Sequence, residues 1–236
     1  MIDPLLEVVG LRAGYGTSQV LDGVDFSMGR ESVAIIGRNG VGKTTLCKTL
    51  MGLIRPSGGD ITFKGDPLAK STPERIARKG MAYVPQGRRL FPSLTVDEHL
   101  AMLAKGTRGR RWTPEAVYDL FPRLGERRKN GGAELSGGEQ QMLSVGRALL
   151  LNAELLVMDE PSEGLAPKIV DTLIDVVQQL IGEGHAVLVV EQNLHAATHM
   201  AHRQLVMVSG RIEAESTAEE LRASPELQRQ YLGVEA

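Results

Sequence analysis

One short segment restricts the fold of this chain more than any other: a glycine-rich loop between an apolar stretch and a helical run. Residues 37–45 read Gly-Arg-Asn-Gly-Val-Gly-Lys-Thr-Thr and fit the pattern G-x-x-x-x-G-K-[ST]. In such a loop the backbone N–H groups converge on phosphate oxygens, and larger side chains would block that approach. Lys43 can reach the β- and γ-phosphates, and the hydroxyl of Thr44 can ligate Mg²⁺. The loop predicts that the chain binds a nucleoside triphosphate.

Around this loop, short apolar strands alternate with helical segments. Continuous apolar strands of this kind indicate a parallel sheet that is covered on both faces. The strands are expected at residues 5–11, 20–28, 32–36, 61–64, 81–84, 155–158, 186–190 and 205–208, with a turn at 13–16. Helices are expected at residues 43–53, 95–104 and 141–151, and a helical insert at 105–133. The chain is therefore predicted to be an α/β protein.

Composition and length restrict the domain size, the class of partner and the cellular compartment expected for this protein. The 236 residues suffice for one large α/β domain, and the net charge of −2, from 27 basic and 29 acidic residues, argues against a nucleic-acid binder. The single cysteine, Cys47, cannot form an internal disulfide and is expected to be a small core residue in a reducing cytoplasm. No apolar run approaches the roughly 18 to 20 residues that span a bilayer, and the first residues lack the features of a signal peptide. Any membrane role is expected to come through partners.

Two consecutive acids, Asp159 and Glu160, follow the apolar residues Leu-Leu-Val-Met of the strand at 155–158. Neighbouring strand residues point to opposite faces, so the two carboxylates are not expected to serve one ligand in the same way. Together with the glycine-rich loop, they indicate a functional pair of acids rather than two solvated acids at a strand end.

A second glycine motif, Leu-Ser-Gly-Gly-Glu-Gln-Gln at residues 135–141, is expected to open a helix that runs from 141 to 151. Exposed backbone N–H groups and the positive end of a helix dipole make an anion site. The motif resembles the signature of the ATP-binding-cassette (ABC) ATPases. The resemblance implies that this segment contacts the ATP of a second subunit, so that the chain works as half of a pair. The implied contacts come from Ser136, Gly137, Gly138 and Glu139.

The same resemblance implies roles for other residues, and ATP and Mg²⁺ as cofactors. Implied ligands of Mg²⁺ are Thr44, Asp159 and Gln86, the last in the family's Q-loop. Implied catalytic residues are Glu160, which polarises the attacking water, with Lys43 and Gln192. Implied ATP-binding residues are Tyr15, which would stack on adenine, and Gly37, Arg38, Asn39, Gly40, Val41, Gly42, Lys43, Thr44 and Thr45.

Two positions depart from the usual family pattern. Ala166 stands where many members have an aspartate, and Gln192 stands where most members carry a switch histidine. An amide can donate a hydrogen bond toward the γ-phosphate but has no titratable proton near neutral pH. We expect a switch that senses phosphate without acid–base chemistry.

Three longer segments indicate one branch of the family. They are residues 83–96, residues 161–167 and residues 190–193, and they resemble the ATPase subunits of bacterial high-affinity branched-chain amino acid importers. The resemblance runs from about residue 5 to residue 233. It implies a single P-loop NTPase domain over residues 1–236, with a RecA-like parallel sheet core, an N-terminal antiparallel β lobe and an inserted α-helical lobe at about 95–150.

The resemblance also implies an assembly at the inner face of the cell membrane. Its members would be a second ATPase, identical or paralogous, two membrane permeases and an extracytoplasmic solute-binding protein. Substrate contacts would lie in those other subunits, so this sequence does not name the solute. The motifs of urea and short-amide importers overlap heavily with the ones found here, and that solute class stays open.

Other classes fit less well. ABC ATPases of DNA repair insert long coiled coils and those of translation usually carry two cassettes, and this chain shows neither feature. A P-loop kinase or GTPase would leave the second glycine motif unexplained, and no Asn-Lys-x-Asp motif occurs. His195, His199 and His202 have the spacing of one helix face, which fits Zn²⁺ binding or, as we favour, a polar surface.

Overall fold

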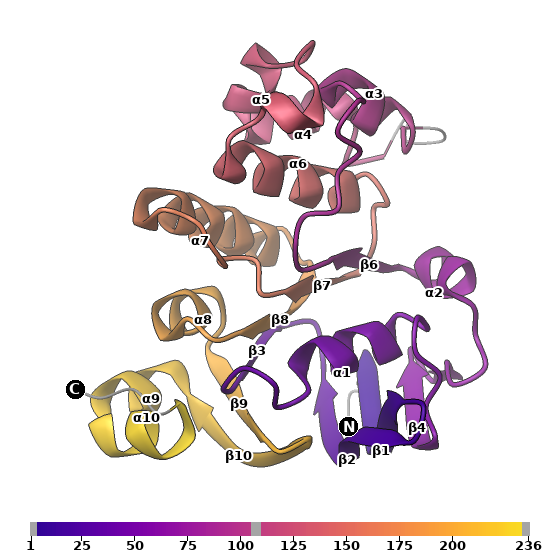
Figure 1. The fold of residues 1–236 in the computed structure, drawn as a ribbon, viewed down its shortest axis with the longest axis vertical. Helices are drawn as coiled ribbons and strands as arrows, with labels where there is room; N and C mark the ends of the chain where they lie inside the picture. The colour runs from indigo at the N-terminus through magenta and orange to yellow at the C-terminus, as the bar shows by residue number, and fades with distance from the viewer. Residues whose placement is uncertain (1–3, 105–109, 233–236) are drawn as a thin grey trace.

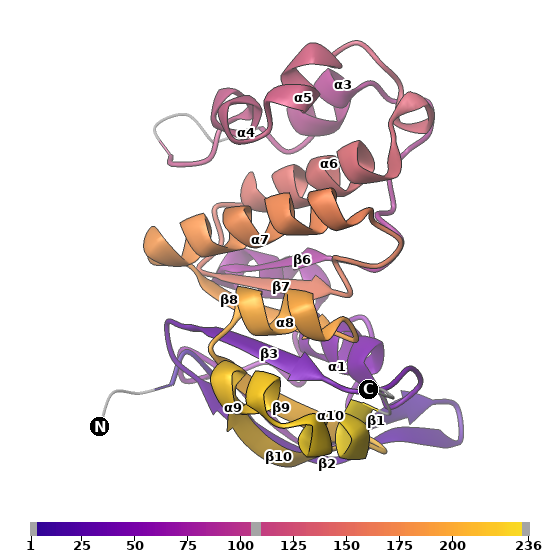
Figure 2. The same ribbon diagram turned by 90° about the vertical axis from the view of Figure 1, so that its left-hand side faces the viewer.

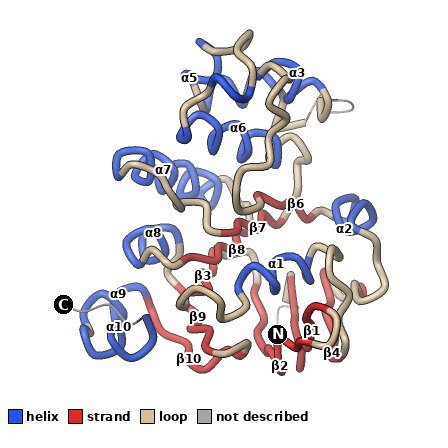
Figure 3. The backbone as a smooth tube through the Cα atoms, in the orientation of Figure 1, coloured by secondary structure: helices blue, strands red, loops and turns tan. Residues whose placement is uncertain are grey.

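A six-stranded sheet forms the centre of the protein in the computed structural model, which describes residues 4–104 and 110–232 (Figures 1 and 3). The strand order is β10-β9-β3-β8-β7-β6, with five parallel strands and β10 antiparallel at one edge. All residues of β7 and β8 are buried, as a sheet covered on both faces requires. The bounds are β3 (Ser32–Ile36), β6 (Met81–Val84), β7 (Leu155–Asp159), β8 (Ala186–Glu191), β9 (Arg203–Val208) and β10 (Arg211–Thr217).

A second, antiparallel sheet is built mainly from the N-terminal part of the chain. Its order is β2-β1-β4-β5, and the long hairpin of β1 and β2 contains several register shifts. The strands are β1 (Leu6–Tyr15), β2 (Ser18–Met28), β4 (Gly58–Phe63) and β5 (Asp66–Pro67). The predicted combination of a parallel core and an antiparallel β lobe is confirmed.

Each face of the central sheet packs against a different part of the protein, which Figures 1 and 2 show from two sides. In β3, Val33 and Ile35 pack with α1 (Lys43–Leu50) and the antiparallel sheet, whereas Ala34 and Ile36 pack on the opposite side. That opposite side is covered by α6 (Gly137–Leu149), α7 (Pro167–Gly182) and α8 (Leu194–Met200). The period of two along β3 thus divides one hydrophobic core into two layers.

The helical lobe lies at the end of the molecule remote from the antiparallel sheet (Figure 1, top). It consists of α3 (Val96–Ala101), α4 (Pro114–Leu120), α5 (Pro122–Glu126), the 3₁₀ helix η1 (Gly132–Glu134) and α6. The remaining helices are α2 (Pro73–Lys79), before β6, and α9 (Ala218–Ala223) and α10 (Pro225–Leu232), after β10. None of the helices within 4–104 and 110–232 has both the length and the apolar character needed to cross a membrane.

Several predicted boundaries were wrong. The helix expected from residue 141 begins at Gly137, because Ser136 caps it and both glycines join its first turn. The helix expected to reach residue 53 ends at Leu50, since the chain turns at Gly52, whose φ is +69°. The turn expected at 13–16 is displaced, because β1 continues to Tyr15.

Candidate nucleotide-binding site

The loop between β3 and α1 has a conformation that only glycine permits at several points. A Cβ atom on Gly37 would lie 2.4 Å from the carbonyl oxygen of Met207 on the neighbouring strand β9. Gly40 and Gly42 have φ angles of +82° and +114°, in the left-handed region that disfavours other residues. The backbone can therefore wind closely into the ring that phosphate binding needs, as the motif predicted.

Lys43, the first residue of α1, folds back over this loop. Its side chain is 3% exposed, and its Nζ donates hydrogen bonds to the carbonyl oxygens of Gly37 (2.8 Å) and Arg38 (3.1 Å). The same ammonium group lies 3.0 Å from Oε1 of Glu160. A buried positive charge is thus fixed at the loop that is built to receive phosphate.

Asp159 is the last residue of β7 and is joined to the glycine-rich loop segment through Thr44. Its side chain is almost completely buried, and each of its oxygens accepts a hydrogen bond: Oδ1 from the Thr44 hydroxyl (2.9 Å) and Oδ2 from the Tyr83 hydroxyl (2.8 Å). Burial raises the pKa of Asp159, and the two hydrogen bonds oppose that shift. The pKa of the Tyr83 hydroxyl is also raised, chiefly by burial, so this group remains a donor. A hydroxyl beside a carboxylate is the oxygen donor set that suits Mg²⁺.

Glu160 lies next to Asp159 in sequence but contacts different partners. It follows β7 in a turn with a φ of +47°, and its N–H donates to the carbonyl oxygen of Val190 (2.9 Å). The Gln86 side chain donates from Nε2 to Oε2 of Glu160 (3.1 Å) and to Oε2 of Glu163 (3.0 Å). The carboxylates of Asp159 and Glu160 therefore have separate surroundings, as expected. The cause is this turn and not the alternation of a strand.

A cavity of about 290 Å³ beside the glycine-rich loop brings most of these residues together; the loop at 37–45 is called the P-loop and this hollow the P-loop cavity. Its lining residues are Val20, Asn39, Gly40, Gly42, Lys43, Thr44, Thr45, Gln86, Glu160 and Glu163. Val20 and Glu163 were missed by the sequence analysis. Tyr15, expected to stack on adenine, is 51% exposed at the end of β1 and is not among the lining residues. The roles assigned to these residues stay predictions.

Next to this cavity, the loop after β8 and the loop after Glu160 enclose a second hollow of about 420 Å³. It is lined by Glu160, Ser162, Glu163, Gly164, Leu165, Glu191, Gln192 and Asn193. Gln192 is exposed, and Asn193 caps α8 by accepting a hydrogen bond from the N–H of Ala196 (3.1 Å). Glu191 is buried and was missed. The only sequence signal for it is an acid directly after an apolar strand.

The signature residues form the first turn of α6. Oε2 of Glu139 accepts a hydrogen bond from the N–H of Ser136 (2.8 Å), and the Ser136 hydroxyl accepts one from the N–H of Glu139 (3.3 Å). A Cβ atom on Gly138 would lie 3.0 Å from the side chain of Ile169, and one on Gly137 would lie 3.2 Å from the guanidinium of Arg88. None of these four signature residues lines the P-loop cavity of its own chain.

The three histidines do not form the helix face that their spacing predicted. Helix α8 ends at Met200, so His202 lies outside it and contacts Glu219 instead. The rings of His195 and His199 lie 4.3 Å apart, on a surface where His195 contacts Asp171. Within residues 4–104 and 110–232, no group of three or more His, Cys, Asp or Glu side chains is arranged to hold a metal ion.

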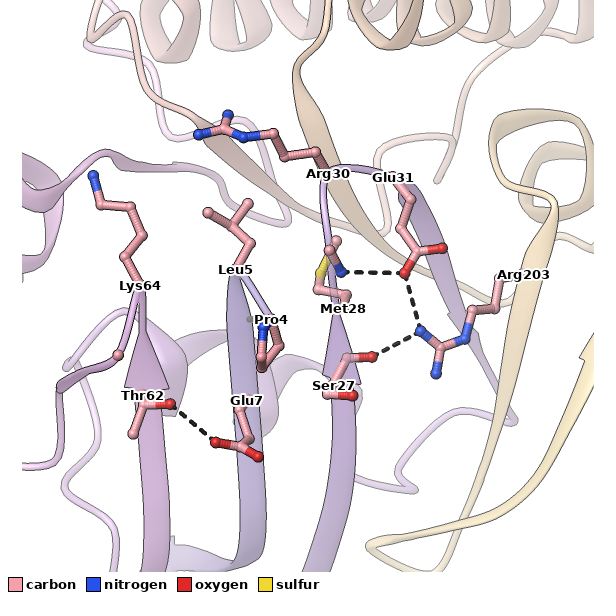
Figure 4. Close-up of a pocket in the computed structure, with 12 residues that line it drawn as sticks. Pro4, Leu5, Glu7, Ser27, Met28, Arg30, Glu31, Thr62, Lys64 and Arg203 are labelled. Carbon is pink, nitrogen blue, oxygen red and sulfur yellow. Dashed lines mark hydrogen bonds and ion pairs between the residues drawn. The ribbon is translucent and has the colours of Figure 1, made fainter. Parts of the chain in front are cut away.

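A larger hollow lies away from the P-loop, at the ends of the antiparallel strands (Figure 4). This groove of about 1110 Å³ carries several charged side chains, and they are paired within the protein. Nη1 of Arg203 donates to Oε1 of Glu31 (3.1 Å) and to the carbonyl oxygen of Ser27 (2.7 Å). Arg30 and Lys64 both contact Glu154. Volume alone would favour this groove, but the converging polar groups favour the smaller P-loop cavity as the functional site.

Comparisons with known proteins agree with this geometry. A family model described as ABC transporter matches residues 21–163. The high-affinity branched-chain amino acid transport ATP-binding protein BraG of Pseudomonas aeruginosa is 42% identical over 222 residues, covering 93% of this chain and 95% of that protein. The probable branched-chain amino acid transport ATP-binding protein LivF of Archaeoglobus fulgidus is 33% identical over 234 residues, covering 98% of this chain and 99% of that protein. The solved structure of an ATP-binding subunit of an ABC transporter has a TM-score of 0.79 at 32% identity and covers 97% of this chain and 96% of its own.

Proposed function

Because the chain belongs to the ABC transporter family, we propose that it is the ATP-hydrolysing subunit of an importer for branched-chain amino acids. The chain is an ATPase with a P-loop NTPase fold. One geometric observation carries the hydrolytic role: Glu160 lies at the edge of the P-loop cavity, 3.0 Å from Nζ of Lys43, while Asp159 is held separately by Thr44 and Tyr83. The solute class rests on the names of the relatives at 42% and 33% identity.

We assign the steps of ATP hydrolysis to this chain's own residues. The loop amides of residues 37–45 and the ammonium group of Lys43 bind the phosphates of ATP. Thr44 and Asp159, with Gln86, would hold Mg²⁺, which neutralises phosphate charge when bound. Glu160 orients the attacking water and accepts its proton.

The surroundings of the chain follow from the same proposal. We propose that two ATPase subunits close head to tail, so that Ser136, Gly137, Gly138 and Glu139 serve the ATP of the partner and Gln192 serves the chain's own. The position of all four signature residues outside the P-loop cavity supports this arrangement. Two permeases and an extracytoplasmic solute-binding protein would complete the importer, with this chain at the inner face of the membrane.

Reconstitution tests the proposal and its alternatives. The tagged chain is purified together with its membrane neighbours, placed in liposomes, and assayed for ATP-dependent uptake of radiolabelled leucine and of urea. We expect leucine uptake that is lost in Lys43→Ala. Uptake of urea alone would select the urea importer instead. ATPase activity that DNA or ribosomes stimulate and permease-containing membranes do not would refute the importer and favour a repair or translation ATPase.

A further inference from the structure

A buried carboxylate connects two loops that border the site. Glu191, the last residue of β8, is 2% exposed. Its Oε1 accepts a hydrogen bond from the N–H of Ser162 (2.9 Å), in the loop that follows Glu160. Its Oε2 accepts hydrogen bonds from the N–H groups of Gln192 (3.1 Å) and Asn193 (3.2 Å), in the loop that follows β8. One side chain therefore binds the backbone of both loops.

The chemistry of this contact favours an ionised acceptor. All three backbone partners of Glu191 are donors, which matches a carboxylate and leaves no acceptor among them for an acidic proton. Burial raises the pKa of Glu191, and its hydrogen bonds with Ser162 and Asn193 oppose that shift. The rest of β8 is apolar, so a carboxylate here carries a desolvation cost that a hydrophobic residue would avoid. The hydrogen bonds to the two loops are what offset it.

We propose that Glu191 is a positioning residue for ATP hydrolysis. It fixes the loop that begins at Glu160 against the loop that carries Gln192, across the hollow of about 420 Å³ that both loops line. The kinetic part of this inference rests on the function proposed above for Glu160 and Gln192. The structural part, a shared acceptor for both loops, does not.

Glu191→Gln changes this contact with almost no change in volume. The glutamine keeps one carbonyl oxygen, and this oxygen accepts the larger number of hydrogen bonds when it faces the N–H groups of Gln192 and Asn193. In that orientation the new NH₂ group faces the N–H of Ser162, which then has no acceptor. In residue-resolved hydrogen exchange we expect the Ser162 amide to exchange at least about 10-fold faster, because its acceptor is lost. The amides of Gln192 and Asn193 should stay within about 3-fold of their original rates.

Steady-state kinetics supply the second measurement. We expect kcat for ATP to fall about 10-fold in Glu191→Gln, with KM within about 2-fold, because the side-chain hydrogen bonds of Glu191 go to Ser162, Gln192 and Asn193 and not to the loop at 37–45. The matched control is Glu31→Gln, since Glu31 also accepts a hydrogen bond from a backbone N–H, that of Gly29 (3.2 Å), but lies in the groove of Figure 4. The control should leave kcat and the exchange of Ser162 unchanged.

The outcomes test the structural part of the inference, the shared acceptor, separately from its kinetic part, the effect on ATP hydrolysis. Unchanged exchange at Ser162 overturns the shared acceptor, and unchanged kcat in a variant whose Ser162 amide does exchange faster reduces Glu191 to a structural residue. If the wild-type chain shows no ATPase activity, the proposed function fails while the exchange measurement still tests the contact. If Glu191→Gln does not fold, hydrogen exchange of the wild-type protein replaces it. Because the amides of Ser162 and Asn193 share Glu191 as acceptor, their exchange must report the same free energy of opening. Fast exchange at Ser162 alone overturns the inference.

Discussion

Removing one hydroxyl group at Tyr83 should weaken the protein measurably, because that group is one of two donors to a buried carboxylate. The Tyr83 hydroxyl donates to Oδ2 of Asp159 (2.8 Å), and Asp159 is 1% exposed. In Tyr83→Phe the ring still packs against the same hydrophobic core cluster, so little volume is lost. Oδ2 of Asp159 would then lose this donor in a place that water scarcely reaches, while Oδ1 keeps the Thr44 hydroxyl.

The expected size of the effect follows from this geometry. A hydrogen bond to a charged group contributes about 1.5 to 3 kcal/mol, and a buried acceptor without its donor loses that amount. For a domain of this size the same loss lowers the melting temperature by about 3 to 12 °C. The effect should be at the upper end if no water enters and at the lower end if one water replaces the hydroxyl.

Urea unfolding and a thermal melt measure the change, with Tyr118→Phe as the matched control. The Tyr118 hydroxyl also donates to an aspartate, Oδ1 of Asp97 (2.5 Å), but the Asp97 side chain is 46% exposed. Water can replace that donor, so we expect a loss below about 1 kcal/mol in the control. If Tyr83→Phe costs no more than Tyr118→Phe, the argument from burial is refuted.

Three further experiments test the proposed site. Glu160→Gln should bind ATP with unchanged affinity but turn it over about 100-fold more slowly, because the water loses its base; near-normal turnover would remove Glu160 from that role. Gln192→Ala should lower turnover about 10-fold and Gln192→His should largely preserve it, since histidine also donates a hydrogen bond; indifference to both changes would exclude a switch at this position. Cys47 is fully buried and its burial raises the pKa of its thiol, so alkylation requires opening of the fold; ATP at 100 times its Kd should slow that labelling about 100-fold, and unchanged labelling would place Cys47 outside the nucleotide-linked core.

The elements that local sequence determines were predicted well. The strands at 32–36 and 81–84 have the predicted bounds, because short runs of buried apolar residues end at glycine or proline on the carboxyl side. The P-loop was also predictable, since its glycines are required by positive φ angles and a close approach to Met207. The predicted burial of Cys47 is confirmed as well.

The parts that were missed depend on contacts between distant segments. Tyr83 lies on β6 and Asp159 on β7, while Glu191 lies on β8 and Ser162 in the loop after β7, and nothing local in the sequence pairs them. The start of α6 was misplaced because two glycines favour a loop on propensity alone, whereas the Ser136 cap and the close packing of Gly138 on Ile169 favour helix. Tertiary contacts determine both the partners of Tyr83 and Glu191 and the residue at which α6 begins.

The order of the strands also explains how the three loops of the site can act together. Strands β6, β7 and β8 are adjacent and parallel, so their carboxyl ends meet at one edge of the sheet. Side-chain contacts then bridge each neighbouring pair: Gln86 after β6 binds Glu160 after β7, and Ser162 after β7 binds Glu191 at the end of β8. A displacement of the loop after β6 must therefore either break the contact between Gln86 and Glu160 or move the loop after β7 with it. If the loop after β7 moves, it must in turn either break the contact between Ser162 and Glu191 or move the loop that carries Gln192. We therefore propose that the loop after β7 couples the other two loops, because within the described residues it forms hydrogen bonds with both: with the loop after β6 through Gln86 and with the end of β8 through Glu191.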